Sequence, residues 1–333
     1  MKKWLRLIIF IIFSLAAAYF GYNYLYLPSI VKLPPPLNPP DFGVSYVNSF
    51  SWTNPWQAGS INKEIENDLI NIKNAGFESI KVSFHFYQDN LVADKITKAA
   101  AKNGIYPIGG LLGHEEKPKN RAFTAQELAE WENFVREEVI KNKDRVYYWE
   151  VWNEPMMTEL PFRYGTAAEY LELLKRTQKI IKEENPAAKV IVTADYTDTE
   201  AKIFTDELLS LGAADYFDYL SFHPYNAIDS RGKYNLTETI AQEKELADKY
   251  HKPLWITEIG SPDSDSSETR QAELALSLFQ TAYKNKIPII WFYWSDHRVF
   301  AVDGKTGWGL VRTDGTFKPA YEQIKSFISS VKN

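Results

Sequence analysis

From Asp41 onward, short apolar runs rich in β-branched and aromatic residues alternate with longer amphipathic stretches. Runs of the first kind are typical of buried strands, and stretches of the second kind are typical of helices that cover a sheet. Strands are predicted at 42–47, 79–86, 105–113, 147–154, 190–196, 219–225, 253–260 and 289–296. Helices are predicted between and after them, at 63–74, 89–103, 124–142, 166–184, 200–210, 236–250, 267–284 and 319–331.

This alternation predicts an α/β fold, a (β/α)8 TIM barrel with parallel strands. An open, doubly wound sheet is the alternative, but the evenly spaced units and the lack of a Gly-rich phosphate loop argue against it. Neither a second folded domain nor a further repeat is predicted. Ligands of such barrels bind at the C-terminal ends of the strands, so residues at those ends are the candidates for function.

An apolar run from Leu7 to Leu27 precedes the barrel pattern and follows Lys2, Lys3 and Arg6. A run of about 20 residues is long enough to span a bilayer as a helix, and the cationic flank predicts a cytoplasmic N-terminus. We therefore expect a single-pass protein of the cell membrane, with its barrel outside the cytoplasm.

The alternative for this segment is a cleaved signal peptide with its cleavage site near the alanines at 16–18, which would give a secreted protein. We favour an uncleaved anchor, residues 1–27, because the apolar run continues past the alanines. Residues 28–40 are rich in proline and predict a semi-extended linker. The barrel domain is expected at 41–333.

Composition excludes several classes of function. The net charge of −5 gives no basic field that would attract nucleic acid. The absence of cysteine excludes disulfides and thiolate chemistry. None of the 5 histidines has the spacing of a metal-binding pair such as HExxH, and the acidic stretch 263–268 lacks the glycine and spacing of a calcium loop. We expect no metal and no cofactor, and we interpret 263–268 as a loop beside the cleft.

Two predicted strands end in carboxylates. The run 147–154 ends in Asn153 and Glu154 just before Pro155, and the run 253–260 carries Glu258. Two carboxyl groups at the mouth of one barrel are what the cleavage of a glycosidic bond requires. Either glutamate alone is equally compatible with a solvated strand end, whereas the pair on this periodic background favours catalysis. A high aromatic content, 15% with 10 Trp and 20 Tyr, suits a protein that stacks sugar rings.

Three motifs carry a resemblance: Trp152-Asn153-Glu154-Pro155 on the fourth strand, TEIG at 257–260 on the seventh and HPY at 223–225 on the sixth. With these motifs and the closing segment 309–321, the chain resembles the retaining glycoside hydrolases of clan A, families 39 and 5, over essentially the whole barrel. The resemblance implies that Glu154 is the general acid/base and Glu258 the nucleophile.

The same resemblance implies three supporting roles. Asn153 would bind the 2-hydroxyl of the sugar, Tyr225 would hydrogen-bond the nucleophile, and His223 would line the site near the acid/base. One position departs from the clan, whose members usually carry an arginine on the second strand where this chain has Lys81. A lysine supplies the charge without the bidentate fork of arginine.

Other candidates come from the pattern of the strands. Alternation places Lys81, Ser83 and His85 on one face of the second strand, as a polar stripe toward the mouth of the barrel. His85 and His114 end the second and third strands, so both are candidates for substrate contacts, although a single strand-end histidine is equally often structural. Trp294 is our choice for the platform beneath the sugar. The neighbouring Trp291 is more easily explained by packing.

Together these observations predict a membrane-anchored retaining β-glycosidase that hydrolyses oligo- or polysaccharides by double displacement, with a carbohydrate as its partner. One alternative is a barrel that binds glycans without catalysis, which would have no need of both glutamates. A second is a transglycosylase, which uses the same residues and differs in its acceptor.

Overall fold

The computed structural model describes residues 32–46, 58–113, 121–157, 164–196, 198–225, 236–265, 267–296 and 306–332. Eight parallel strands close into a barrel in sequence order, with β1 paired to both β2 and β8. The strands are β1 (Phe42–Ser45), β2 (Ser79–His85), β3 (Tyr106–Leu112), β4 (Tyr148–Val151), β5 (Lys189–Thr193), β6 (Tyr219–Phe222), β7 (Leu254–Ile259) and β8 (Ile289–Trp291). The predicted TIM barrel is confirmed.

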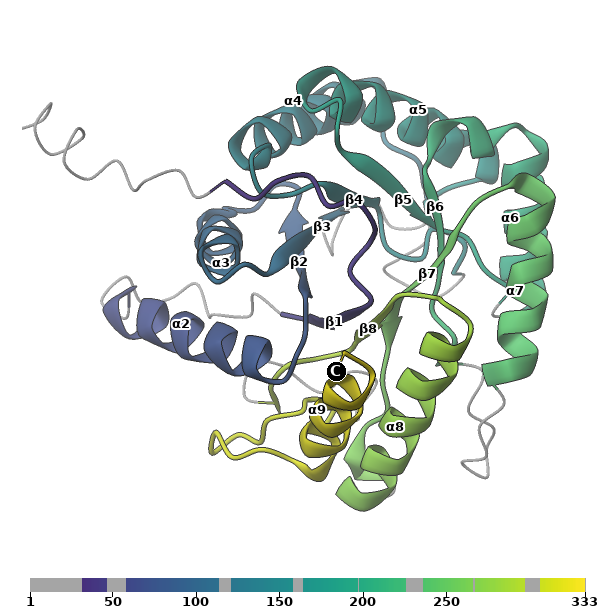
Figure 1. The fold of residues 1–333 in the computed structure, drawn as a ribbon. Helices are drawn as coiled ribbons and strands as arrows, with labels where there is room; N and C mark the ends of the chain where they lie inside the picture. The colour runs from purple at the N-terminus through teal and green to yellow at the C-terminus, as the bar shows by residue number, and fades with distance from the viewer. Residues whose placement is uncertain are drawn as a thin grey trace, which may run out of the picture. The chain divides into compact units, whose positions relative to one another are not determined.

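A helix follows each strand, and the helices surround the barrel (Figure 1). They are α2 (Ala58–Asn74), α3 (Leu91–Lys102), α4 (Ala125–Asn142), α5 (Ala167–Glu184), α6 (Thr199–Ser210), α7 (Leu236–Tyr250), α8 (Glu268–Lys284) and α9 (Pro319–Lys332). Two of them begin at capping boxes, in which Thr124 pairs with Glu127 and Thr166 with Glu169. Such reciprocal bonds satisfy free N–H groups at a helix start, which explains why these boundaries could be predicted closely.

Strand alternation separates an apolar outer face from a polar inner one. On β2, Ile80, Val82 and Phe84 are fully buried, while Lys81 contacts carboxylates inside the barrel. The predicted direction of Lys81 is thereby confirmed.

Large aromatic rings fill the layer between the strands and the helices. Trp149 of β4 lies against Phe84, with ring centroids 5.4 Å apart, and over Gly109 of β3. A Cβ at position 109 would lie 2.5 Å from that indole, so only glycine fits beneath it. This packing fixes β2, β3 and β4 relative to one another.

The chain reaches β1 along the barrel rather than as a free spacer. Leu33 is buried, its N–H donates to the carbonyl of Asp144 at 3.0 Å, and its carbonyl accepts from the Tyr147 hydroxyl at 2.8 Å. The residues from Leu33 onward form one compact unit. Within the predicted linker 28–40, Leu33 therefore packs on the barrel, whereas Leu37 is fully exposed.

The expected membrane anchor, residues 1–27, lies outside the described residues. Within the described ranges, no helix combines the length and apolar character needed to cross a membrane.

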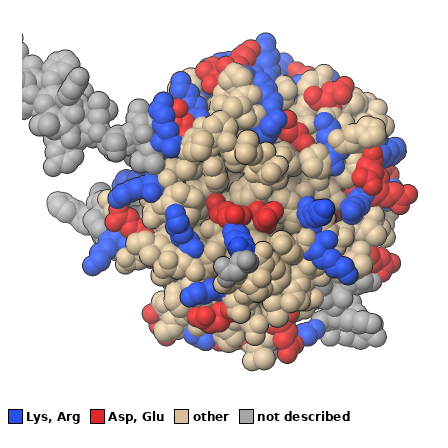
Figure 2. Space-filling model, viewed as in Figure 1, with Lys and Arg blue, Asp and Glu red and all other residues tan. Residues whose placement is uncertain are grey.

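Charge is mixed over the face of the molecule that Figure 2 shows, where Lys and Arg side chains are interspersed with Asp and Glu. No broad basic field is visible on this face, in keeping with the net charge of −5. A mixed surface of this kind favours solubility over nonspecific binding to nucleic acid.

Candidate active site

The backbone bends sharply where β4 ends. Trp152 and Glu154 both have left-handed conformations, with φ of 69° and 47°, which non-glycine residues seldom adopt. The Trp152 ring is 3% exposed and packs among Phe123, Trp131 and Tyr164. This packing turns the indole away from the barrel axis. Asn153 and Glu154 then lie beyond the end of the strand, at the mouth of the barrel.

The two glutamates meet at that mouth. One carboxylate oxygen of Glu154, one of Glu258 and one ring nitrogen of His223 all lie within 4.8 Å of one another. Glu154 Oε1 lies 2.7 Å from His223 Nδ1, and the Tyr225 hydroxyl donates to Glu258 Oε1 at 3.0 Å. Each glutamate side chain is 13% exposed, so both are reachable from solvent but largely withdrawn from it. Such a separation matches the roughly 5 Å that a retaining glycosidase needs.

Beneath these groups, the fully buried Glu150 of β4 is a hub in the barrel interior. Its Oε1 accepts hydrogen bonds from Thr257 at 2.6 Å, Thr193 at 2.8 Å and Ser221 at 3.0 Å, and its Oε2 contacts Lys81 Nζ. The donors come from β7, β5, β6 and β2. A buried carboxylate needs such partners to remain charged, so the hub joins five strands through one anion.

The charges of the hub reinforce one another. Burial by itself would raise the pKa of Glu150, but Lys81 and His223 hold it well below its ordinary value. Burial disfavours the charged form of Lys81, yet the negative charges of Glu150 and Glu258 raise its pKa. Lys81 Nζ lies 3.8 Å from Glu258 Oε2. The lysine therefore remains a cation beneath the predicted nucleophile, in the place where the clan usually has an arginine.

Opposing influences act on the predicted nucleophile. Burial is the largest and raises the pKa of Glu258, whereas the positive charges of His223 and Lys81 and the hydrogen bond from Tyr225 lower it. Burial also disfavours a charged His223, but Glu258 and the hydrogen bonds to Glu150 and Glu154 raise its pKa to about 10. The imidazole is therefore held as a cation between the carboxylates at neutral pH.

An aromatic wall that sequence analysis did not single out stands beside Tyr225. The rings of Phe292 and Trp308 lie 6.1 Å and 5.9 Å from that of Tyr225 and 5.6 Å from each other. Burial and then the negative charges of the two glutamates raise the pKa of Tyr293 well above its ordinary value. Four aromatic residues run together at 291–294, and their sequence alone gave no reason to choose between them.

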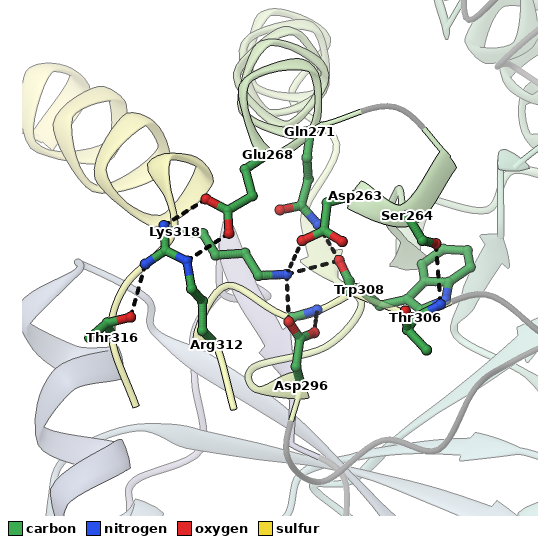
Figure 3. A network of polar contacts seen from close by, with 12 residues as sticks. Asp263, Ser264, Glu268, Gln271, Asp296, Thr306, Trp308, Arg312, Thr316 and Lys318 are labelled. Atoms are coloured by element: carbon green, nitrogen blue, oxygen red, sulfur yellow. Dashed lines mark hydrogen bonds and ion pairs between the residues drawn. The ribbon is translucent and has the colours of Figure 1, made fainter. Parts of the chain in front are cut away.

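A buried lysine holds the loops that carry this wall. Figure 3 shows Lys318 between Asp263, which follows β7, and Asp296, which follows β8. Lys318 Nζ lies 2.7 Å and 2.6 Å from their carboxylates and donates to the carbonyl of Gly307 at 3.0 Å. This ion cluster ties the β7 and β8 loops together immediately before Trp308 and so fixes the direction of its ring.

The structure brings most of the predicted site residues together: Glu154, Glu258, His223, Tyr225 and Lys81 form one connected cluster. Asn153 is half-buried beside Glu154, and its side-chain amide has no hydrogen bond to a described residue, so it is available to a ligand. His85 is half-buried at the end of β2, where its backbone is bound by Asn90. His114 lies outside the described residues.

Trp294, the expected sugar platform, does not fit that role. Its side chain is 1% exposed and its ring packs near Phe317 and Tyr321, with centroids 6.4 Å and 5.9 Å away. A ring buried to this extent cannot offer a face to a sugar. Trp291 is fully buried, in line with the packing role that its sequence position favoured.

The cluster is better suited to proton chemistry than to holding a metal ion. Glu154, His223 and Glu258 are close enough to share an ion, but both ring nitrogens of His223 already have hydrogen-bond partners, Glu154 and Thr257. A bound ion would have to break the 2.7 Å contact between His223 and Glu154.

A closed parallel barrel with paired carboxylates after β4 and on β7 is the arrangement found in the retaining glycoside hydrolases of clan A. The chain belongs to the cellulase family, glycosyl hydrolase family 5, whose family model matches residues 92–298.

Comparison with individual proteins gives the same class. The chain is 25% identical over 249 residues to a beta-xylosidase from Caldicellulosiruptor saccharolyticus, covering 68% of this chain and 50% of that protein. It thus spans half the length of this curated relative.

Solved structures share the fold. A family 39 glycoside hydrolase from Bacteroides cellulosilyticus is 20% identical, with a TM-score of 0.69 over 88% of this chain and 64% of the other. GH5_18 from Streptomyces cattleya, solved in complex with Manb1-4GlcNAc, is 16% identical, with a TM-score of 0.67 over 88% and 81%.

Proposed function

We propose that this glycoside hydrolase cleaves β-linked oligo- or polysaccharides by double displacement. The observation that carries the proposal is the placement of the Glu154 and Glu258 carboxylates within 4.8 Å of each other, one beside His223 and the other beside Tyr225. The β linkage is supported by the names of two similar proteins, a beta-xylosidase and a protein bound to Manb1-4GlcNAc.

The proposed double displacement assigns a step to each side chain. Glu258 attacks the anomeric carbon as the bond from that carbon to the leaving oxygen breaks, and Glu154 gives its proton to this oxygen. A water molecule then loses a proton to Glu154 as its oxygen attacks the same carbon, which releases Glu258 as a carboxylate. Two inversions leave the β configuration intact. We assign the 2-hydroxyl to Asn153, because hydrogen bonds to this hydroxyl strengthen in the transition state.

The test is a screen of aryl β- and α-glycosides and of polysaccharides against the chain from Leu33, with product sizing and NMR of the first-formed anomer. Hydrolysis of β-glycosides that first yields the β anomer supports the proposal. Transfer to added sugars in place of water would indicate the transglycosylase alternative. Glycan binding without any cleavage would indicate the barrel without catalysis.

The rate should depend on pH as a bell with its optimum on the mildly acidic side. Glu258 must be ionised to attack, and a raised pKa means that ionisation is complete only at a higher pH. The acidic limb of kcat/KM is therefore expected above the ordinary glutamate value of about 4.3. Glu154 must still carry the proton that it gives to the leaving oxygen, so the rate should fall again at alkaline pH. A profile that is flat from about pH 4 to 9, with chemistry rate-limiting, would contradict these roles.

We propose further that residues 1–27 retain the protein in the membrane with the barrel outside the cytoplasm, because the apolar run is long and has a cationic flank. Cell fractionation should find the full-length chain in the membrane, and protease should reach the barrel from outside. A soluble exported chain with a new N-terminus near Tyr19 would contradict the anchor.

A chain starting at Leu33 should fold and remain soluble, because Leu33 and the residues after it belong to the barrel unit.

A further inference from the structure

His223 is hydrogen-bonded at both ring nitrogens, and the directions of these bonds can be deduced. Glu150 is an ionised carboxylate that only accepts hydrogen bonds, so the Thr257 hydroxyl, 2.6 Å away, must donate its single hydrogen to it. Thr257 Oγ1 is then left as an acceptor for His223 Nε2, which lies 3.0 Å away. Nε2 therefore carries a hydrogen, and Nδ1 is the nitrogen that exchanges a proton with Glu154.

We propose that Glu150 and Thr257 form a relay behind His223 that fixes its Nε2 hydrogen and thereby controls the protonation of the acid/base Glu154. Thr257 is a positioning residue in this proposal. It directly precedes the nucleophile Glu258 in the sequence, but it acts on the other carboxylate, Glu154. The inference rests on the proposed glycosidase function and adds a determinant of its acid step.

The chemistry of the pair explains why the relay matters. When Nδ1 also carries a hydrogen, it donates to Glu154 Oε1, and the catalytic proton must then occupy the other oxygen, Oε2. When Nδ1 is bare, it accepts a hydrogen from Oε1, and that proton points at the imidazole instead of at the leaving oxygen. The first state holds one proton more than the second, taken up from solvent, and the relay favours it because Nε2–H of the imidazolium gives its hydrogen bond to a hydroxyl polarised by the anionic Glu150.

Other groups around His223 support the same state. Its main-chain N–H donates to Asp195 Oδ2 at 3.1 Å, which holds the start of the β6 loop in place. The charged and titratable side chains of the cluster are Lys81 on β2, Glu150 and Glu154 on and after β4, Asp195 after β5, Tyr225 after β6, Glu258 on β7 and Tyr293 after β8. The carboxylates among them outnumber the one lysine, so a cationic imidazole is favoured there.

The chain offers a matched control for this relay. Thr257 and Thr193 are both fully buried, and each donates one hydrogen bond to Glu150 Oε1, at 2.6 Å and 2.8 Å. Thr193 contacts Ser221, whereas Thr257 contacts His223. Changing either threonine to valine removes one bond to the hub, but only Thr257→Val removes the acceptor of Nε2.

The experiment compares Thr257→Val with Thr193→Val by kcat/KM on two β-glycosides, one with a poor alkyl leaving group and one with an activated aryl group. Relative to Thr193→Val, we expect Thr257→Val to lose about tenfold on the poor leaving group and to change little on the activated one, because only the first needs the acid. Its alkaline limb should also move to lower pH. Thr257→Ser should restore the wild-type behaviour.

Equal losses for Thr257→Val on both substrates, or no difference from Thr193→Val, would overturn the relay. Nitrogen-15 NMR of the wild-type imidazoles tests it without a variant that must fold, with the His223 signals assigned by their absence in His223→Gln. Protonated Nε2 at all pH values below the alkaline limb supports the relay, and a bare Nε2 overturns it. Because the NMR needs no substrate, it still decides the state of Nε2 in a wild type that cleaves no glycoside, an outcome that would defeat only the proposed function.

Discussion

Glu258→Ala is expected to lose nearly all activity on every glycoside, on the order of 10⁴-fold or more in kcat/KM. The reason is geometric: within the described ranges, Glu258 is the carboxylate held by both Tyr225, at 3.0 Å, and Lys81, at 3.8 Å, which fits the role of nucleophile that we propose for it. Removing it eliminates the covalent route, so even an activated leaving group should not rescue the variant.

A matched control separates this effect from a loss of folding. Glu138 on α4 is also a buried carboxyl, 3% exposed and paired with Lys141, but it belongs to the helix layer. Glu138→Ala should lower the melting temperature without abolishing cleavage. Azide added to Glu258→Ala should attack the substrate directly and give an α-glycosyl azide. Substantial turnover by this variant on an aryl β-glycoside would remove Glu258 from the role of nucleophile.

Glu154→Ala is expected to have a selective effect. Activity on natural glycosides should fall by roughly 10²- to 10⁴-fold, the usual contribution of a general acid. An activated aryl glycoside needs no proton to depart, so formation of the glycosyl-enzyme should persist with it. Azide should then react with this intermediate from the side that Glu154 vacated and give a β-glycosyl azide. Product NMR and pre-steady-state release of the aryl group measure both effects.

The stereochemistry of the azide products decides the roles. If Glu154→Ala gives the α-azide and Glu258→Ala the β-azide, the two roles are exchanged. If both variants keep full activity on a substrate that the wild type cleaves, neither glutamate is catalytic, and the barrel would then be better interpreted as a glycan-binding protein.

The barrel was predictable because its signals are local. The change from strand to helix periodicity, and helix boundaries such as Thr124 and Thr166, depend on residues only a few positions apart. The bend after β4 was not predictable. Strand β4 ends at Val151 rather than at Glu154, since Trp152 takes a left-handed conformation that is stabilised by distant rings.

Two aromatic assignments show the same limit. Trp294 is buried against Tyr321, whereas Trp308, which follows the same strand later in the chain, forms the wall beside Tyr225. Which face a ring presents after the last strand depends on how the loop is held, and here Lys318 and its two aspartates hold it. These ion pairs join parts of the chain that no local pattern relates.

The sequence by itself determined the eightfold alternation, the presence of Glu154 and Glu258 near the ends of the fourth and seventh strands, and the inward direction of Lys81, because period-2 alternation and motif spacing are properties of single strands. Only the tertiary structure decided that Glu150 is a hub. A signal existed, since Glu150 is a charged residue within the otherwise apolar run 147–152. Its meaning depends on Thr193, Ser221 and Thr257, which closure of the barrel brings to one buried carboxylate from three other strands.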